Sequence, residues 1–383
     1  MRILLLHSSS DLYGASKIFL QTVQLLKKQG HTCYVVVSAE GPLVEKLKQD
    51  NIQVTVINLG IIRRKYFSPL GIINRVKKWY QASAFLNKYI EQNGIDLVYA
   101  NTTAVLLGAY LAHKNKIKHV WHVHEIIEKP KFLILFIQWL MKRYTATIIC
   151  VSKAVQDHWS INNPSLLSKM QVVYNGIGPV EKSTEANFRT QYQIPKEAIV
   201  IGMAGRVHFW KGQSYFLQIA KQLLKPSTEN NQAKPLYFII TGDAFPGYEY
   251  LVDEIQNFIK NHQLGDRIFY TGFEHEMDKF YSSIDLLILP SQLPDPLPTV
   301  VLEAMQYGIP VVATAQGGAL EMIAENETGI FIPMDDVTIA TNKIYELLQK
   351  EGQLAMKEKC IQRVNQHFSI TAFENNIENL FHS

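Results

Sequence analysis

Short apolar runs alternate with helix-length segments along almost the whole chain. Residues 15–29, for example, have helical spacing and close on Gly30. The runs read RILLLH, CYVVVS, QVTVIN, IDLVYA, HVWHVH and ATIICV in the first half, then AIVIGMAG, LYFIITGD, RIFYTGF, DLLILPS, IPVVAT and GIFIP. Strands that are apolar on both faces and alternate with helices indicate parallel sheets covered by helices. The pattern predicts an α/β fold with two doubly wound parallel-sheet domains.

The periodic pattern breaks after Asn175, where VVYNGIGPVEKSTEANFRT becomes polar, as a linker between domains does. We therefore predict an N-terminal domain over residues 1–180 and a C-terminal domain over residues 181–365. In open α/β sheets, ligands bind beyond the carboxyl ends of the strands. Two such domains facing each other would place the site in the cleft between them.

Composition narrows the class of protein. The chain has 383 residues, of which 47% are hydrophobic and 19% charged, and its net charge of +4 suits an anionic small molecule or a membrane surface better than nucleic acid. Cys33, Cys150 and Cys360 have neither disulfide nor metal spacing, which predicts buried, reduced thiols in a cytoplasmic protein. The apolar run in MRILLLHSSS is too short for the hydrophobic core of a signal peptide, and KFLILFIQWLMKR is too short to span a membrane. We therefore expect a soluble or peripheral protein.

Two strand-to-helix turns of the first half carry candidate binding residues. Gly14 and Ala15 leave room for a phosphate or sugar at a helix N-terminus, although an ordinary turn glycine fits the spacing equally well. In VWHVHEI, His122 and His124 alternate at the end of an apolar strand. No further residue at suitable spacing completes a metal site, so we favour contact between His124 and substrate over a structural role.

In the second half, GMAGRVHFWKGQ joins a strand to a helix. Arg206 and Lys211 could clamp a diphosphate across this turn, the guanidinium as a fork and the ammonium as a point charge. A solvated loop often carries such a pair, and both interpretations remain open. Further along, ATAQGGALEMI sets a glycine pair before Glu321 at another strand-to-helix turn.

The stretch DPLPTVVLEAM places two carboxylates, Asp295 and Glu303, around the start of a predicted helix. Pro298 lies where a first-turn proline is tolerated, so the amides of Thr299–Val301 should be unpaired and available to a phosphate. Glu303 lies among apolar neighbours one turn further on. A lone buried carboxylate is costly, so this residue needs a partner, and a ribose diol would serve.

The chain contains neither a D-x-D pair nor a G-K-[ST] loop. It resembles the family 4 glycosyltransferases, retaining enzymes with the two-domain GT-B fold. The resemblance runs from YGASK through HVHEI, ICVSKAV and VVYNGI to GMAGRVHFWKG, TGDA, LPSQLPDPLPTVVLEAMQYGIPVVATAQGGALEMI and TGIFIP. The family's E-x7-E motif falls on Asp295 and Glu303, where an Asp replaces the first Glu.

The resemblance implies a role for each candidate. The first domain would bind the acceptor and the second the nucleotide sugar, with the final helix of about residues 366–383 packing back on the first domain. The catalytic set would be His124, Arg206, Lys211 and Asp295. Donor binding would fall to Gly14, Ala15, Arg206, Lys211, Pro298, Thr299, Val300, Glu303 and Glu321, with no metal and no other cofactor.

The implied reaction moves a sugar from a nucleoside diphosphate sugar, UDP favoured, to an acceptor hydroxyl with retention of configuration. The basic and aromatic helical segments of the first half suit either a membrane surface or packing on a sheet. Membrane contact would favour a lipid-linked acceptor and a place at the inner face of the membrane. Two alternatives stay open: a sugar-nucleotide epimerase of similar architecture, and a catalytically silent nucleotide-sugar-binding subunit.

Overall fold

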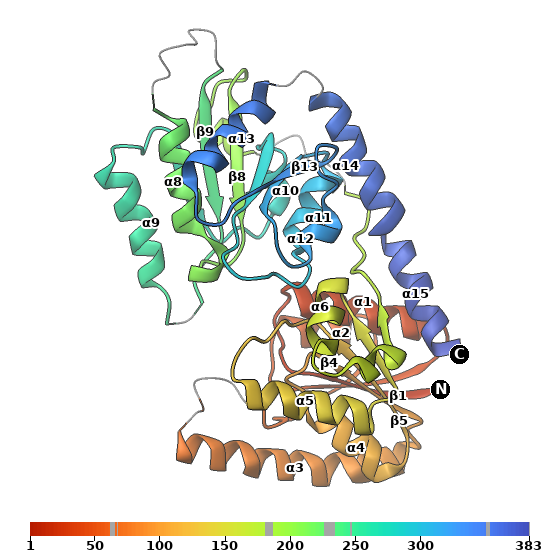
Figure 1. The fold of residues 1–383 in the computed structure, drawn as a ribbon. Coiled ribbons are helices and arrows are strands. Elements are labelled where there is room, and N and C mark those ends of the chain that lie inside the picture. The colour runs from red at the N-terminus through yellow and green to blue at the C-terminus, as the bar shows by residue number, and fades with distance from the viewer. Residues whose placement is uncertain are drawn as a thin grey trace. The chain divides into compact units, whose positions relative to one another are not determined.

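The computed structural model describes residues 1–61, 66, 68–180, 187–225, 234–245, 247–349 and 353–382 (Figure 1). The chain divides into two compact units. Unit 1 comprises Met1–Gly176 and Ile370–Ser383, and unit 2 comprises Ile177–Ser369. Each unit contains one parallel sheet with helices around it, so the predicted fold class is confirmed.

Unit 1 is built on a seven-stranded sheet with the order β3-β2-β1-β4-β5-β6-β7. Its strands are β1 (Arg2–His7), β2 (Thr32–Val37), β3 (Gln53–Val56), β4 (Leu97–Asn101), β5 (Lys118–Val123), β6 (Thr147–Cys150) and β7 (Met170–Val172). Its helices are α1 (Gly14–Lys28), α2 (Pro42–Gln49), α3 (Pro69–Asn93), α4 (Leu107–Asn115), α5 (Lys131–Tyr144), α6 (Lys153–Ser160), the 3-10 helix η2 (Pro164–Lys169) and the returning helix α15 (Ile370–His382).

Unit 2 repeats this plan in a six-stranded sheet with the order β10-β9-β8-β11-β12-β13. Its strands are β8 (Ile199–Ala204), β9 (Leu236–Thr241), β10 (Ile268–Gly272), β11 (Leu286–Leu289), β12 (Val311–Thr314) and β13 (Gly329–Ile332). Its helices are α7 (Phe188–Gln191), η3 (Phe209–Lys211), α8 (Gln213–Leu223), α9 (Tyr250–Asn261), α10 (Met277–Tyr281), α11 (Thr299–Gln306), α12 (Ala319–Met322), α13 (Val337–Gln349) and α14 (Gln353–His367).

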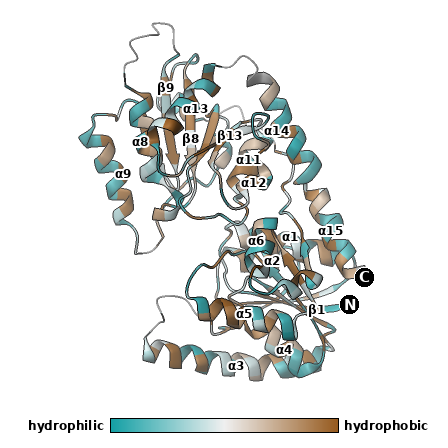
Figure 2. Cartoon of the chain, in the orientation of Figure 1, coloured by the Kyte–Doolittle hydropathy of each residue, from teal (hydrophilic) through white to brown (hydrophobic). Residues whose placement is uncertain are grey.

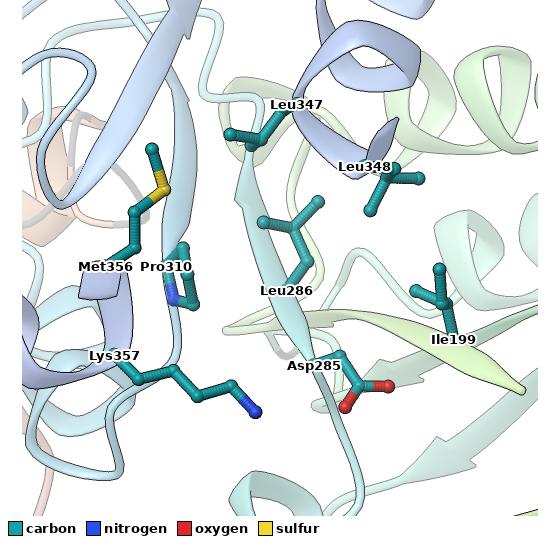
Figure 3. Close-up of a pocket in the computed structure, with 8 residues that line it drawn as sticks. All are labelled: Ile199, Asp285, Leu286, Pro310, Leu347, Leu348, Met356 and Lys357. Carbon is teal, nitrogen blue, oxygen red and sulfur yellow. The ribbon is translucent and has the colours of Figure 1, made fainter. Parts of the chain in front are cut away.

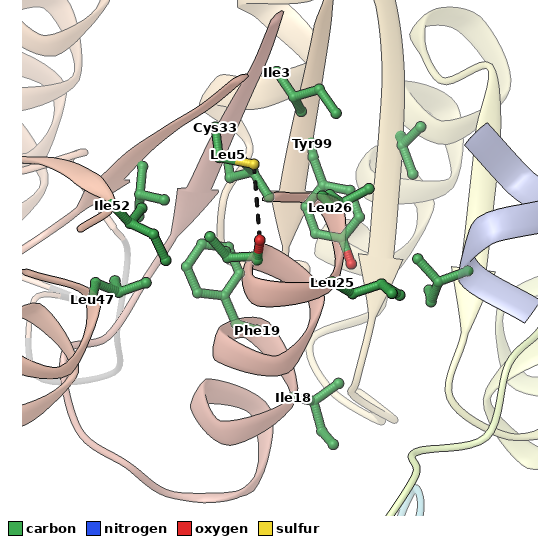
Figure 4. Packing of buried hydrophobic residues seen from close by; sticks show 14 of the residues in the cluster. Ile3, Leu5, Ile18, Phe19, Leu25, Leu26, Cys33, Leu47, Ile52 and Tyr99 are labelled. Carbon is green, nitrogen blue, oxygen red and sulfur yellow. Dashed lines mark hydrogen bonds between the residues drawn. The ribbon is translucent and has the colours of Figure 1, made fainter. Parts of the chain in front are cut away.

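The core of unit 1 joins segments from both ends of the sequence. Phe19 of α1 packs in one cluster with β-strand residues such as Leu5 and Tyr99, and Figure 4 shows these side chains meeting between helix and sheet. Phe373 and Ile377 of α15 belong to the same cluster. Burying large apolar side chains is the main stabilising term in folding, so the last helix is an integral part of this unit.

All twelve runs predicted as strands are strands in the structure. The sequence interpretation missed β7, because this strand has only three residues and, among the strands that the structure describes, pairs with β6 alone. The three cysteines are free and buried, as predicted. Burial raises the pKa of each thiol, to about 12 for Cys150, which keeps the group protonated at neutral pH.

Unit 2 also contains a small pocket at the amino ends of its strands, which Figure 3 shows in close-up. Ile199 begins β8, Leu286 begins β11, and Met356 of α14 lies across from them. Asp285 lines the pocket but accepts hydrogen bonds from Arg189 Nη2 at 2.5 Å and from the Val200 amide at 2.9 Å. This pocket lies at the ends of the strands opposite to those that carry the candidate residues.

Candidate functional site

Both sheets have a topological switch point, where consecutive connections leave in opposite directions. It lies between β1 and β4 in unit 1 and between β8 and β11 in unit 2. Ligands of open α/β sheets bind beyond the carboxyl ends of strands at such points. The candidate residues of each unit lie on the loops and the first helical turns that follow the strands at these points or the strand next to them, and each unit is described by itself below.

In unit 2, the structure joins two candidates that the sequence kept apart. Lys211 Nζ lies 2.6 Å from Asp295 Oδ1, and Ser291 Oγ donates to Asp295 Oδ2 at 2.7 Å. The side chains of Lys211 and Asp295 are 20% and 16% exposed, so water and ligands still reach the pair. A diphosphate that bound the ammonium would therefore compete with Asp295 for it or share it.

Close backbone approaches hold the loops around this ion pair. Gly212 has a φ of +81°, and a Cβ on it would lie 2.0 Å from the Pro290 carbonyl oxygen. A Cβ on Gly317 would lie 2.3 Å from the Asp295 carbonyl oxygen, which also accepts a hydrogen bond from the Gly318 amide at 2.8 Å. Any larger residue would push the loops apart, so glycine is required at both positions.

Arg206 follows β8 and lies over an aromatic ring. Its guanidinium carbon is 3.9 Å from the centroid of Phe245, a cation–π contact, and its carbonyl oxygen accepts from Gln213 Nε2 at 3.0 Å. Stacking on one face leaves the in-plane N–H groups of a guanidinium suited to an anion. The predicted clamp thus consists of one stacked cation and one ion-paired cation.

The helix predicted to start near Pro298 is α11, and Pro298 is its N-cap residue. Thr299 and Val300 form the first turn and are partly exposed. The Val301 amide donates to the Pro298 carbonyl at 3.0 Å, so the prediction that it would be unpaired was wrong. The first turn is closed by this hydrogen bond between residues three apart. An anion at this end of the helix would bind to the amides of Thr299 and Val300 and would be favoured by the helix dipole.

Glu303 lies one turn into α11 and has a partner in the structure. Tyr281 donates its hydroxyl proton to Glu303 Oε2 at 2.6 Å. Burial, followed by the charge of Glu303, raises the pKa of Tyr281 well above its usual range, so the phenol remains a donor. Glu303 is partly exposed, which leaves carboxylate acceptor positions for a ligand hydroxyl.

Glu321 lies on the short helix α12, directly after the glycine pair. Its carbonyl oxygen accepts from Arg363 Nη2 at 2.7 Å, and the Met322 carbonyl accepts from Arg363 Nε at 2.6 Å. Arg363 of α14 therefore anchors the turn of backbone that carries Glu321. The carboxylate itself is partly exposed.

In unit 1, Gly14 and Ala15 form the start of α1. A Cβ on Gly14 would meet no atom within 4 Å, so sterics alone do not require glycine there. Ala15 is tied to the neighbouring strand, because its carbonyl accepts from Asn101 Nδ2 at 3.2 Å. The helix start is thus fixed beside the carboxyl end of β4.

His124 follows β5 and is partly exposed. Its Nε2 lies 2.9 Å from Asn101 Oδ1, and its amide donates to Glu125 Oε2 at 3.1 Å. Burial, with smaller contributions from His122 and His7, holds the pKa of His124 well below its usual value, so the imidazole is neutral at pH 7. A neutral imidazole has one donor nitrogen and one acceptor nitrogen, and Nε2 of His124 is already paired with Asn101.

His122 has a different environment. It is fully buried, its Nδ1 is 2.5 Å from the Tyr99 hydroxyl, and burial lowers its pKa to about 3. Within the described parts of the chain, no three His, Cys, Asp or Glu residues gather into a set of metal ligands. Of the two histidines, His124 is therefore the one that a ligand can reach.

The sequence interpretation missed the residues that hold these candidates in place. In unit 1 these are His7, Ser16 and Asn101, which are buried and hydrogen-bonded to one another or to His124. In unit 2 they are Tyr281 and Ser291. His7 and Asn101 could have been found, because both are polar residues at the carboxyl end of a predicted strand. Tyr281 carries no such signal.

Comparison with known families matches both units. A family model described as Glycosyltransferase Family 4 matches residues 13–180, and one described as Glycosyl transferases group 1 matches residues 184–367. The UDP-Gal:alpha-D-GlcNAc-diphosphoundecaprenol alpha-1,3-galactosyltransferase of Escherichia coli is 22% identical over 384 residues, which covers 97% of this chain and 94% of that protein. A lipopolysaccharide 1,2-N-acetylglucosaminetransferase of Salmonella typhimurium is 28% identical over 56% of this chain and 57% of its own length.

Solved structures share the fold over the whole chain. The crystal structure of Anabaena Alr3699/HepE in complex with UDP-glucose has a TM-score of 0.83 at 23% identity and covers 100% of this chain and 99% of that chain. WaaG, a glycosyltransferase involved in lipopolysaccharide biosynthesis, has a TM-score of 0.71 at 14% identity, with 99% of each chain covered. These likenesses confirm the GT-B fold expected from the resemblance.

Proposed function

The chain belongs to family 4 of the glycosyltransferases, and from this premise we propose that it transfers a sugar from a UDP-sugar to an acceptor hydroxyl. The observation that carries this proposal is the arrangement at the carboxyl edge of the unit 2 sheet. There the Lys211–Asp295 ion pair and the N-terminus of α11 lie on neighbouring, interlocked loops. UDP-bound structures of Anabaena Alr3699/HepE support UDP as the nucleotide.

In this proposal each part of the donor has its own partners. Arg206, Lys211 and the first amides of α11 bind the diphosphate, because two cations and a helix N-terminus all favour negative charge. Glu303 binds the ribose diol through its carboxylate, and Asp295 and His124 contact the transferred sugar. Gly14 and Ala15 support the phosphate from unit 1, and Glu321 contributes a carboxylate beside the sugar.

We propose that the reaction retains the anomeric configuration. The acceptor oxygen forms a bond to the anomeric carbon on the face from which the diphosphate leaves, and the acceptor proton passes to the departing phosphate oxygen. Arg206 and Lys211 stabilise the charge that develops on the diphosphate, and this electrostatic contribution is usually large. The proposal assigns that role to these two side chains rather than to a metal ion.

The test is turnover of a panel of UDP- and GDP-sugars, read by release of free nucleoside diphosphate. We expect slow release without acceptor from one UDP-sugar, unchanged by EDTA, and faster release when a suitable acceptor is added. Proton NMR of the first-formed product then reports the anomeric configuration. An isomerised sugar without transfer would indicate an epimerase, and binding without turnover would indicate a silent nucleotide-sugar-binding subunit.

For the acceptor, we propose a lipid-linked glycan reached at an anionic membrane surface. No helix within the described residues is both long and apolar enough to cross a bilayer. Helix α5 nevertheless exposes Phe132 (69%), Leu135 (58%) and Trp139 (51%), and α3 exposes Leu70 (81%) and Tyr80 (65%). Figure 2 shows hydrophobic residues recurring along both helices, and each of them contacts α4 through an aromatic pair, Trp79–Tyr110 for α3 and Tyr144–His113 for α5.

Exposed cations accompany this apolar surface. Lys131, Lys142 and Arg143 are exposed on α5, as is Lys77 on α3. Apolar side chains flanked by cations are typical of helices that lie in the interface of an anionic bilayer. The undecaprenol-linked substrate in the name of the Escherichia coli relative also supports a lipid-linked acceptor.

Vesicle sedimentation tests the membrane contact. We expect the protein to pellet with vesicles that contain phosphatidylglycerol, and to do so less with pure phosphatidylcholine or at high salt. Phe132→Ser combined with Trp139→Ser should abolish pelleting without loss of fold, because both side chains are exposed. Ile339→Ser, at a similarly exposed position of unit 2 (49%), is the matched control. Equal pelleting of the double variant and the control would refute the proposed contact.

A further inference from the structure

We propose that Asn101 is a positioning residue that holds His124 as the tautomer protonated on Nε2, so that Nδ1 is presented as an acceptor to a sugar hydroxyl. The identity of the ligand rests on the proposed function, whereas the tautomer does not. The inference comes from the direction of each hydrogen bond in a buried chain of unit 1. Asn101 is the last residue of β4 and is fully buried.

The side-chain amide of Asn101 has three partners. Its Nδ2 lies 3.2 Å from the Ala15 carbonyl oxygen and 3.1 Å from His7 Nδ1, and its Oδ1 lies 2.9 Å from His124 Nε2. A backbone carbonyl only accepts, so the NH2 group must face Ala15 and the amide oxygen must face His124. An amide oxygen also only accepts. His124 Nε2 must therefore carry a proton and donate it to Asn101.

The same reasoning applies to the hydrogen bonds on the other side of Asn101, which lead through His7 and Ser16 to Asp11. His7 Nδ1 accepts from Asn101, so the neutral His7 ring carries its proton on Nε2 and donates to Ser16 Oγ at 2.9 Å. Ser16 Oγ then donates to Asp11 Oδ1 at 2.8 Å. A carboxylate accepts only, so Asp11 fixes the direction of the Ser16 and His7 bonds, which agrees with the direction that the Ala15 carbonyl imposes on Asn101 and His124.

Further contacts stabilise the ionised carboxylate of Asp11, where this series of hydrogen bonds ends. Ser9 Oγ donates to Asp11 Oδ2 at 2.8 Å, and the Tyr13 amide donates to Oδ1 at 3.2 Å. Burial alone would raise the pKa of Asp11, but the hydrogen bonds from Ser16, Ser9 and the Tyr13 amide outweigh it, and the net shift is downward. The carboxylate is ionised at neutral pH, so the hydrogen bonds donated by Ser16 and His7 keep one direction.

The other ring nitrogen of His124, Nδ1, is the atom that we assign to the ligand. Among the described residues, no hydrogen bond reaches His124 Nδ1, and the residue is partly exposed. With the proton fixed on Nε2, Nδ1 can only accept. A sugar hydroxyl that meets this atom must donate to it, which fixes the orientation of that hydroxyl.

The tautomer can be measured directly in the wild-type protein. Long-range ¹H–¹⁵N spectra of ¹⁵N-histidine-labelled protein separate protonated from unprotonated ring nitrogens, and His124→Gln identifies the signals of His124 by their loss. We expect a protonated Nε2 and an unprotonated Nδ1 for His124 at pH 7. The opposite pattern, or a mixture of both tautomers, would overturn the inference.

Asn101→Asp tests the positioning role. A carboxylate cannot donate to Ala15 or His7, and it favours a doubly protonated ring at His124, whose other titratable neighbours are His7, His122 and Glu125. We expect His124 to become doubly protonated at pH 7 and kcat/KM for the donor to fall about tenfold, the effect of one lost hydrogen bond. Unchanged His124 signals together with unchanged kcat/KM would overturn the positioning role.

Two further variants keep the test falsifiable if Asn101→Asp folds poorly. Asn115→Asp is the matched control, because Asn115 also donates its amide to a backbone carbonyl, that of Leu111, on α4. It should leave both the His124 signals and kcat/KM unchanged. Ser16→Ala removes the acceptor of His7 and should release the His7 tautomer, while Asn101, still held by Ala15, keeps His124 protonated on Nε2. Loss of the His124 tautomer in Ser16→Ala would contradict the inference that Asn101, held by the Ala15 carbonyl, is sufficient to fix it.

The two readouts separate this inference from the proposed function. The tautomer is read without any donor, so it stands or fails whatever the substrate is. If no nucleotide sugar is turned over but His124 shows a protonated Nε2, only the proposed function fails. If a donor is turned over but His124 is protonated on Nδ1, only this inference fails.

Discussion

The first six strands of unit 1 follow the same order as the six strands of unit 2, yet the residues at the two carboxyl edges differ in charge and burial. At the edge of unit 1, buried neutral groups form a series of hydrogen bonds that ends at the carboxylate of Asp11, with His7 and Asn101 at 1% and 0% exposure. The edge of unit 2 carries charges, with Lys211 and Asp295 left at 20% and 16% exposure. The architecture determines where ligands bind, and the loop residues determine what kind of ligand binds.

The difference follows from the cost of desolvation. A neutral polar group can be buried at small cost if every hydrogen bond is made, whereas a buried ion loses several kcal/mol of hydration. Neutral donors and acceptors suit an uncharged polyol such as a sugar. Partly hydrated cations suit a diphosphate, which can replace the water that they hold.

The largest effect should come from removing a cation at the edge of unit 2. We expect Lys211→Met to lower kcat by about 100- to 1,000-fold, the usual range for a group that stabilises developing negative charge. Lys343→Met is the matched control, since Lys343 is an exposed lysine of α13 that, among the described residues, donates to the Phe331 carbonyl alone. If both variants kept wild-type kcat in the diphosphate-release assay, unit 2 would not supply the charge stabilisation.

The next effect concerns the carboxylate one turn into α11. Glu303→Ala should raise KM for the donor and lower kcat/KM by about 30-fold, because a charged acceptor for the ribose is lost. Tyr281→Phe serves as its control, since it removes the hydrogen bond to Glu303 but keeps the carboxylate. The control should stay within about threefold of wild type. Equal kcat/KM in Glu303→Ala and wild type would show that Glu303 does not bind the ribose.

Acid should weaken unit 1 before unit 2. His119 and His122 are buried in unit 1, and burial lowers the pKa of each to about 3. Both are neutral in the folded state, whereas the unfolded chain takes up protons as the pH falls below about 6.5. The unfolded state then binds more protons, and the two residues together cost about 1 kcal/mol of stability between pH 7 and pH 6.

Hydrogen exchange at both pH values measures this difference. Amides of β4 and β5 in unit 1 should lose protection at pH 6, after correction for the intrinsic rate, and those of β8 and β11 should not. Glu125 opposes the trend, because burial raises the pKa of its carboxyl group, but it is one group against His119, His122 and His124, whose pKa values burial lowers. Equal loss in both sheets would contradict the predicted acid sensitivity of unit 1.

The smallest effect should come from Asp295→Glu. The longer side chain can rotate so that its carboxylate still meets the ammonium of Lys211. The ion pair therefore survives, and kcat/KM should stay within about threefold of wild type or improve. Asp295→Asn is the informative partner variant, because it keeps the shape and removes the charge opposite Lys211. A drop in Asp295→Glu as large as that in Asp295→Asn would show that length, rather than charge, decides the role of this residue.

The sequence allowed the two sheets to be predicted because their central strands are buried on both faces and read as unbroken apolar runs. The short edge strand β7 could not be predicted, since three residues carry no periodicity. The start of α11 could be predicted from Pro298, but the pairing of the Val301 amide could not. That hydrogen bond depends on how tightly the first turn winds.

The candidate residues followed from motifs, but their partners did not. Lys211 and Asp295 are 84 residues apart, and Asn101 and His7 are 94 apart, so only the folded sheets bring them together. Gly317 illustrates the same limit. A glycine pair is visible in the sequence, whereas its close approach to the Asp295 carbonyl oxygen is a property of two docked loops.

Helix α15 reverses the order in which the two units can be completed during translation. Residues Met1–Gly176 of unit 1 are synthesised before unit 2, yet Phe373, Ile377 and Phe381 of the unit 1 core are synthesised after it. Unit 2 ends at Ser369 and has all its residues before that helix exists. The N-terminal unit must therefore wait with an open apolar face while a later unit is synthesised and folds, a period in which chaperones would have a surface to bind.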